Sequence, residues 1–134
     1  MKSFLALIAL LCLACTASAR QRSIHSCDEA PLLADLQRQL PDYILATSAD
    51  VQPKLISKMP QFALSLYKRS SASLICVVVA LDSSGKTQGV MISYPAGLTL
   101  TSRERDELLP LQWSPAQLNG QPRPSLVSIK VSAR

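Results

Sequence analysis

The stretch Leu74-Ile75-Cys76-Val77-Val78-Val79-Ala80-Leu81 decides how this chain folds. It is apolar throughout and rich in β-branched residues, which is typical of a central strand buried on both faces. Asp82-Ser83-Ser84-Gly85 follows and has the composition of a tight turn. Lys86 to Tyr94 then predicts the returning strand of a hairpin, which Pro95 ends.

The turn also carries a near match to a phosphate-binding loop. Residues 80–87 fit the pattern G-x-x-x-x-G-K-[ST], except that Ala80 replaces the first glycine. A phosphate loop needs a helix directly after the Lys-Thr pair, so that the helix N-terminus meets the phosphates. A strand pattern follows here instead, so we predict a plain hairpin turn.

Downstream of the hairpin, the sequence predicts one helix and one strand. Thr101 and Glu104 form a T-x-x-E capping box, and Pro110 limits the helix that they start to about two turns. Ser125 to Ser132 closes the chain as an alternating strand. Its predicted apolar face consists of Val127, Ile129 and Val131.

Upstream of residue 74, the sequence predicts helices. Asp28 to Leu40 has an apolar stripe with Pro31 in its first turn, and Pro41 ends it. A second short helix is predicted between Pro53 and Pro60. Residues 62–71 fit either a short strand or a helix end. We therefore predict a small α+β fold, in which two or three helices pack on one face of a three-stranded antiparallel sheet.

The first residues predict export. Lys2 precedes an apolar run from Phe4 to Leu13, and Ala17-Ser18-Ala19 offers a small-x-small cleavage pattern. Residues 1–19 therefore read as a cleavable signal peptide, and we expect the protein to be exported. The alternatives are an uncleaved membrane anchor, for which the run is short, and a lipid-anchored form modified at Cys15.

Cleavage leaves two cysteines, Cys27 and Cys76. In an exported domain they most simply form one disulfide bond, and the alternative is two buried free thiols. A bond across about 50 residues stabilises a fold by about 4 kcal/mol in the chain-entropy model. Two cysteines with the single His25 lack the ligand number of a zinc site, so we predict no metal and no cofactor.

Charge and side-chain chemistry exclude several functions. Removing Lys2 from the 14 basic residues leaves 13 against 9 acidic residues, and these positive charges are scattered rather than interleaved with aromatics. Nucleic acid is therefore not an expected partner. One histidine and no G-x-S-x-G pattern leave no catalytic constellation, so we predict that the protein is not an enzyme.

Residues 51–132 resemble the TonB carboxy-terminal domain, the periplasmic end of an energy transducer of Gram-negative bacteria. The resemblance rests on the strand and D-x-x-G turn at residues 74–85, and on the strand at residues 90–93 with Gly97 after it. Leu108-Leu109-Pro110-Leu111-Gln112-Trp113-Ser114-Pro115-Ala116 and the turn Asn119-Gly120-Gln121-Pro122 are its most specific features. The chain departs from the family in its cleavable signal and in an N-terminal extension at residues 20–50, ahead of the TonB-like domain at residues 51–134.

The resemblance implies a binding role. The last strand of the family accepts an N-terminal box of an outer-membrane receptor, and a strand at a sheet edge can add an extended peptide. Carried over by position, the predicted peptide-binding edge is Leu126, Val127, Ser128, Ile129, Lys130, Val131 and Ser132. The alternatives are that the N-terminal extension blocks this edge, or that the protein is a structural accessory subunit of an envelope complex with no peptide-reading role.

Overall fold

The computed structural model describes residues 24–60 and 63–131. The predicted signal peptide, Cys15 and Ser132 therefore lie outside the described residues. The helical elements are η1 (Cys27–Glu29), α2 (Pro31–Gln39), η2 (Ala46–Ser48), α3 (Ala63–Lys68) and α4 (Ser102–Leu108). The strands are β1 (Ile44–Leu45), β2 (Ile75–Leu81), β3 (Thr87–Tyr94), β4 (Ala116–Leu118), β5 (Gln121–Arg123) and β6 (Ser125–Val131).

The main sheet has four strands in the order β1-β6-β2-β3. β2 pairs antiparallel with both β3 and β6, whereas β1 adds to β6 in parallel. β4 and β5 form a separate two-stranded hairpin, which turns at Asn119 and Gly120 with positive φ values of 54° and 76°. The prediction of an α+β fold is confirmed, but the sheet is a mixed one rather than the three-stranded antiparallel sheet that we expected.

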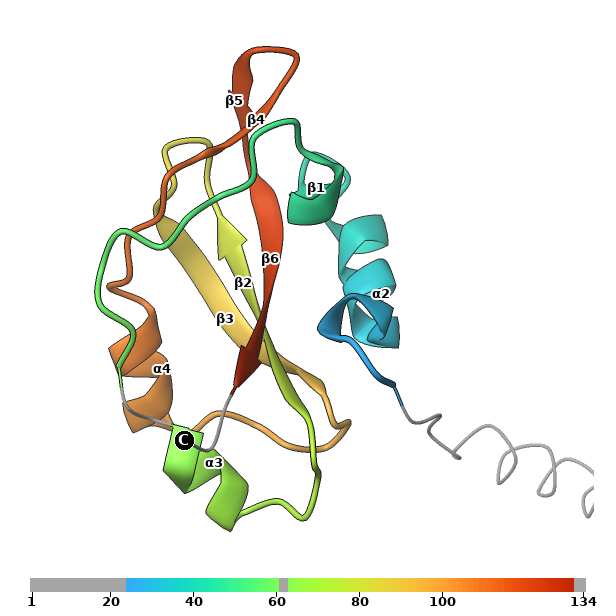
Figure 1. Ribbon diagram of the computed structural model, residues 1–134, viewed down its shortest axis with the longest axis vertical. Coiled ribbons are helices and arrows are strands. Elements are labelled where there is room, and N and C mark those ends of the chain that lie inside the picture. The colour runs from blue at the N-terminus through green and yellow to red at the C-terminus, as the bar shows by residue number, and fades with distance from the viewer. Residues whose placement is uncertain (1–23, 61–62, 132–134) are drawn as a thin grey trace, which may run out of the picture.

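Helices cover both faces of the sheet, so the prediction that they pack on one face is wrong (Figure 1). Val77 and Val79 of β2 point into a core with Leu66 of α3 and Leu108 of α4. The alternate residue Val78 points the other way, into a cluster with Leu33 of α2. Because successive side chains of a strand point to opposite faces, the continuous apolar run of β2 fills both cores.

Three of the helices follow the sequence closely. α2 begins at Pro31 and ends at Gln39, just before Pro41, where the sequence predicts its end. α3 shows that residues 63–68 are helical, which decides between the two structures that the sequence allowed there. Both reciprocal hydrogen bonds of the capping box between Thr101 and Glu104 are present at the start of α4.

The helix predicted between Pro53 and Pro60 is absent. This segment runs extended, and it forms β-bridges from Val51 to Gln117 and from Leu55 to Trp113. The Ser114 N–H donates to the Lys54 carbonyl at 2.8 Å. The backbone groups of this segment are thus bonded to a distant part of the chain, so the helix-like spacing of its apolar residues does not determine its structure.

Candidate functional site

The candidate site is the side of β6 that faces away from β2. β6 pairs with β2 along all its residues, from Ser125 to Val131. On its other side β1 pairs with only two of them, Ser125 with Ile44 and Leu126 with Leu45. Among the described residues, no strand pairs with the remainder of β6 on that side, although η1 and η2 also lie against β6, so strand pairing covers the edge at its start and ends at Leu126 (Figure 1).

The backbone groups available at the open edge follow from one hydrogen bond. The Ile44 N–H donates to the Pro124 carbonyl at 3.0 Å, so the carbonyl of residue 124 points away from β2. The N–H and C=O groups of a strand point alternately to its two sides. Those of Ser128 and Lys130 therefore also point away from β2, into the open edge.

The side chains of β6 divide between the two cores. Leu126 is buried against Leu33 of α2, while Val127 and Val131 are buried in the core beneath α3 and α4. Ser128 and Ile129 are half-buried, and Lys130 is exposed. The side chains thus fix β6 to both layers, and the open edge presents mainly backbone.

A hollow of about 160 Å³ lies beside the start of the open edge. It lies between β6 and the residues that follow β1, and its lining includes Asp28, Leu33, Ala46, Thr47, Pro53 and Ser128. The Ser128 Oγ is buried and has no hydrogen-bond partner within the part of the chain that the structure describes. An extended segment added to β6 would therefore have space for a side chain here.

The far end of β6 is held by α3. The Tyr67 hydroxyl donates to the Val131 carbonyl at 2.8 Å, and Leu66 is fully buried in the core that Val131 also joins. α3 therefore holds the last described residue of β6 in place.

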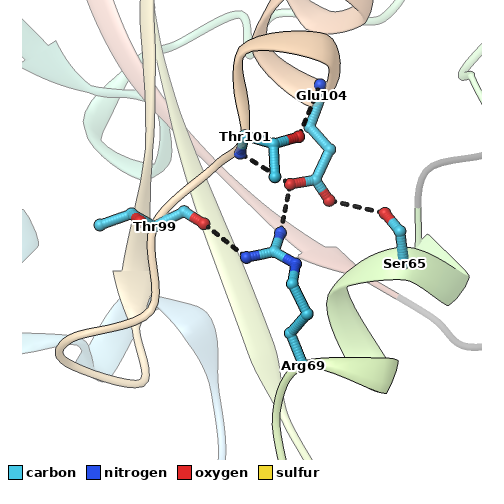
Figure 2. Close-up of polar contacts among 5 residues, drawn as sticks. All are labelled: Ser65, Arg69, Thr99, Thr101 and Glu104. Carbon is cyan, nitrogen blue, oxygen red and sulfur yellow. Dashed lines mark hydrogen bonds and ion pairs between the residues drawn. The ribbon is translucent and has the colours of Figure 1, made fainter.

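A polar cluster fastens α3 to α4 (Figure 2). The Glu104 carboxylate is buried and accepts from the Ser65 Oγ at 2.6 Å and from the Thr101 N–H at 2.8 Å. It also forms an ion pair with Arg69, whose other guanidinium nitrogen donates to the Thr99 carbonyl at 3.0 Å. Thr101 at the start of α4 and Arg69 at the end of α3 thus bind the same buried carboxylate.

This environment lowers the pKa of Glu104. Burial alone would raise the pKa, but the hydrogen bonds donated by Ser65, by Thr101 and by Arg69 together outweigh it. The pKa of Asp82 is also lowered, chiefly because the Ser84 hydroxyl and the Lys86 N–H donate to its carboxylate in the turn. Both carboxylates are therefore ionised at neutral pH, in structural roles.

Sequence reasoning found Glu104 through the capping box but missed Arg69 and Tyr67. Arg69 stands in the polar run Lys68-Arg69-Ser70-Ser71, which reads as solvated. Tyr67 reads as a core residue, and nothing local indicates that its hydroxyl bonds the last strand. Both contacts join residues that are more than 30 positions apart.

The predicted disulfide is present between Cys27 and Cys76, with their Cα atoms 5.4 Å apart. Cys76 is fully buried in β2, on the face that carries α2. The bond therefore anchors η1, and with it the start of the N-terminal segment, to the central strand.

Two further observations concern other kinds of site. Within residues 24–60 and 63–131, no group of three or more histidine, cysteine or acidic side chains is placed to hold a metal ion. The helices in the same ranges are too short and too polar to cross a membrane.

Comparison with known proteins gives no relative for this chain. No family model matches it, and neither the curated proteins nor the solved structures contain a match. The function is therefore argued below from the residues and their geometry.

Proposed function

We propose that this protein is an exported, TonB-like binding module that recognises an extended segment of an envelope protein by strand addition to β6. The segment could belong to an outer-membrane receptor, which would connect the module to TonB-dependent transport across the outer membrane. No cofactor and no enzymatic step is part of this proposal.

The half-covered edge of β6 carries the proposal. β2 pairs with β6 over its whole length, whereas β1 pairs with Ser125 and Leu126 alone. Because the backbone groups of a strand point alternately to its two sides, the N–H and C=O groups of Ser128 and Lys130 face outward, away from β2. Unpaired backbone of this kind is a template for a further strand.

Three other features support it. The resemblance to the TonB carboxy-terminal domain implies peptide binding at this same strand. The apparent signal peptide and the disulfide fit an envelope location. The sheet is backed on both sides, because β6 places Leu126 in one core and Val127 and Val131 in the other, so a partner would meet an edge that is already ordered.

The test is a binding assay on the isotope-labelled, disulfide-bonded mature protein. Peptides from the N-termini of outer-membrane receptors should cause saturable shifts concentrated at Ser128 to Val131. Lys130→Pro removes a donor from the open edge and leaves the pairing with β2 intact, and proline is tolerated at sheet edges. This variant should fold and lose binding, whereas Lys130→Ala, which keeps the N–H, should bind like the parent.

Two results would count against strand addition. One is binding by a folded Lys130→Pro variant at parental affinity. The other is a set of shifts that fall away from β6, which would move the contact to another surface.

A structural accessory subunit is the second candidate. The observation that favours it is β1 itself, since a strand that covers the start of the edge leaves a short stretch for a peptide. In this case affinity purification of the tagged protein from envelope extracts should yield a partner at fixed stoichiometry, and the Lys130→Pro variant should retain that partner.

A further inference from the structure

We propose that β1 is an internal stand-in for the partner strand, and that a partner gains the full edge of β6 by displacing it. This inference rests on the proposed function, because it concerns regulation and recognition at the same edge. It also states the chemistry of the partner: an extended segment with an aliphatic residue where Leu45 now lies.

β1 occupies the backbone positions that a partner would use. Its two residues lie beside Ser125 and Leu126 in register, and the Ile44 N–H already bonds the Pro124 carbonyl. Beyond Leu45 the chain leaves the sheet and enters η2 at Ala46. A partner added while β1 is in place would therefore meet a shortened edge that begins at Ser128.

β1 is paired to β6 at only two backbone positions. It has only two residues, and both Ile44 and Leu45 are half-buried. Of the residues on either side of it, Tyr43 is half-buried in the cluster beneath α2 and Ala46 is buried in the main core, so opening of β1 also has to release these two side chains. Strands of this length are stable only where their neighbours hold them, and local opening of such segments costs much less than global unfolding.

The side chains of β1 indicate what the partner must carry. Leu45 packs with Leu126 and Leu33 in the cluster beneath α2. Paired residues of neighbouring strands project to the same face of the sheet. A segment that replaces β1 must therefore place an aliphatic side chain on Leu126, or it leaves that cluster uncovered.

A peptide that copies residues 42–47 of this chain, Asp-Tyr-Ile-Leu-Ala-Thr, is the probe. Ile44→Pro removes the N–H that bonds Pro124 and should free the edge, whereas Ile44→Ala keeps that N–H. By fluorescence polarisation, the labelled peptide should bind Ile44→Pro at least tenfold more tightly than it binds the parent or Ile44→Ala. The same peptide with aspartate in place of its leucine should not bind. Equal affinity for the parent and both variants would overturn the inference.

Hydrogen exchange on the parent protein gives a second measurement that needs no variant. With saturating peptide, the Ile44 N–H should lose protection while the Ser128 N–H, which the copied peptide reaches in the register of β1, gains it. Unchanged protection at Ile44 in the bound state would overturn the displacement.

Receptor peptides separate this inference from the proposed function. If they bind the parent and Ile44→Pro equally, the peptide-binding function stands and the displacement of β1 is refuted. If only the copied peptide binds, and only to Ile44→Pro, β1 is confirmed as a displaceable stand-in and receptor binding is refuted.

Discussion

Replacing Glu104 with alanine should destabilise the fold by about 2–3 kcal/mol, although Glu104 lies outside the candidate edge. The buried carboxylate accepts from Ser65, Thr101 and Arg69. Loss of a capping residue costs about 1 kcal/mol, and a hydrogen bond to a charged group contributes about 1.5–3 kcal/mol. Removing one partner of a fully buried pair costs about 3–5 kcal/mol, but the side chain of Arg69 is 36% exposed and can regain water. The expected loss of stability is therefore smaller than the sum of these contributions.

The assay is urea unfolding of the disulfide-bonded protein, followed by the fluorescence of Trp113. At about 1–3 kcal/mol per molar urea, the midpoint should fall by about 0.7–3 M. Glu107→Ala is the matched control on the same helix, because Glu107 lies 3.7 Å from an Arg103 side chain that is 91% exposed. Such a surface pair contributes at most about 1 kcal/mol. Equal midpoints for the two variants would refute the role assigned to the buried carboxylate.

The same carboxylate predicts a pH dependence. Because the pKa of Glu104 in the folded protein lies below the usual 4.5, its contribution to the free energy of unfolding is fully present above pH 4.5. The contribution is lost as the pH falls through the lower, folded-state pKa. Between pH 6 and pH 3 the parent should therefore lose more stability than Glu104→Gln, which has no charge to lose. Parallel stability curves for the two proteins would contradict this reasoning.

Two further predictions concern the hairpin turn and the disulfide. Gly85→Ala should be severely destabilising in thermal unfolding, because φ is +88° and a Cβ would lie 1.9 Å from the Trp113 carbonyl oxygen. Gly97→Ala is the control: φ is +84° but the space around it is open, so it should cost only about 1–2 kcal/mol. Equal losses of stability in the two variants would show that the close approach to Trp113 is irrelevant. Replacing Cys27 and Cys76 together with serine should lower the free energy of unfolding by about 4 kcal/mol, given their separation of 49 residues, and unchanged urea midpoints would refute a stabilising role for the bond.

The elements predicted correctly are those with local signals. A run of β-branched residues, turn chemistry and a capping box act within a few residues of one another, so β2, the hairpin and α4 could be predicted from the sequence. The extended segment at residues 51–57 could not, because its backbone partners lie about 60 residues downstream, at residues 112–117. Its prolines and apolar spacing fit a helix equally well, and only the distant pairing decides between the two structures.

The sequence contained enough information to predict that both faces of the sheet are covered. Cys76 alternates with Val77 along β2, so a bond from Cys27 to Cys76 requires the N-terminal segment to lie on the face opposite Val77. α3 and α4 fill the other face. The disulfide and the alternation were each predicted, but the fold prediction did not combine them.

Part of the candidate site could not be predicted from the sequence either. Alternation along residues 125–132 predicts a strand, and the resemblance to the TonB carboxy-terminal domain implies that this strand lies at an edge. Whether that edge is open depends on Ile44 and Leu45, which stand about 80 positions earlier and carry no strand signal of their own. A two-residue parallel strand forms only because α2 and the disulfide bring it to β6.

The disulfide also determines how β1 could leave the sheet. Cys27 is bonded to Cys76 near the start of β2, and α2 is held separately through Leu33, which packs on Val78. Both anchors lie before residue 40, and on the other side of β1 the Asp50 N–H donates to the Gln117 carbonyl at 2.9 Å, so residues 41–49 can move away from β6 while α2 remains on the sheet. Displacement of β1 is thus a local event that costs a few hydrogen bonds, the contacts of Tyr43 and Leu45 beneath α2, and the burial of Ala46 in the main core. For the same reason, reduction of the disulfide is not required for a partner to bind, and the affinity of the copied peptide for Ile44→Pro should be the same with the bond intact or removed by substitution of both cysteines.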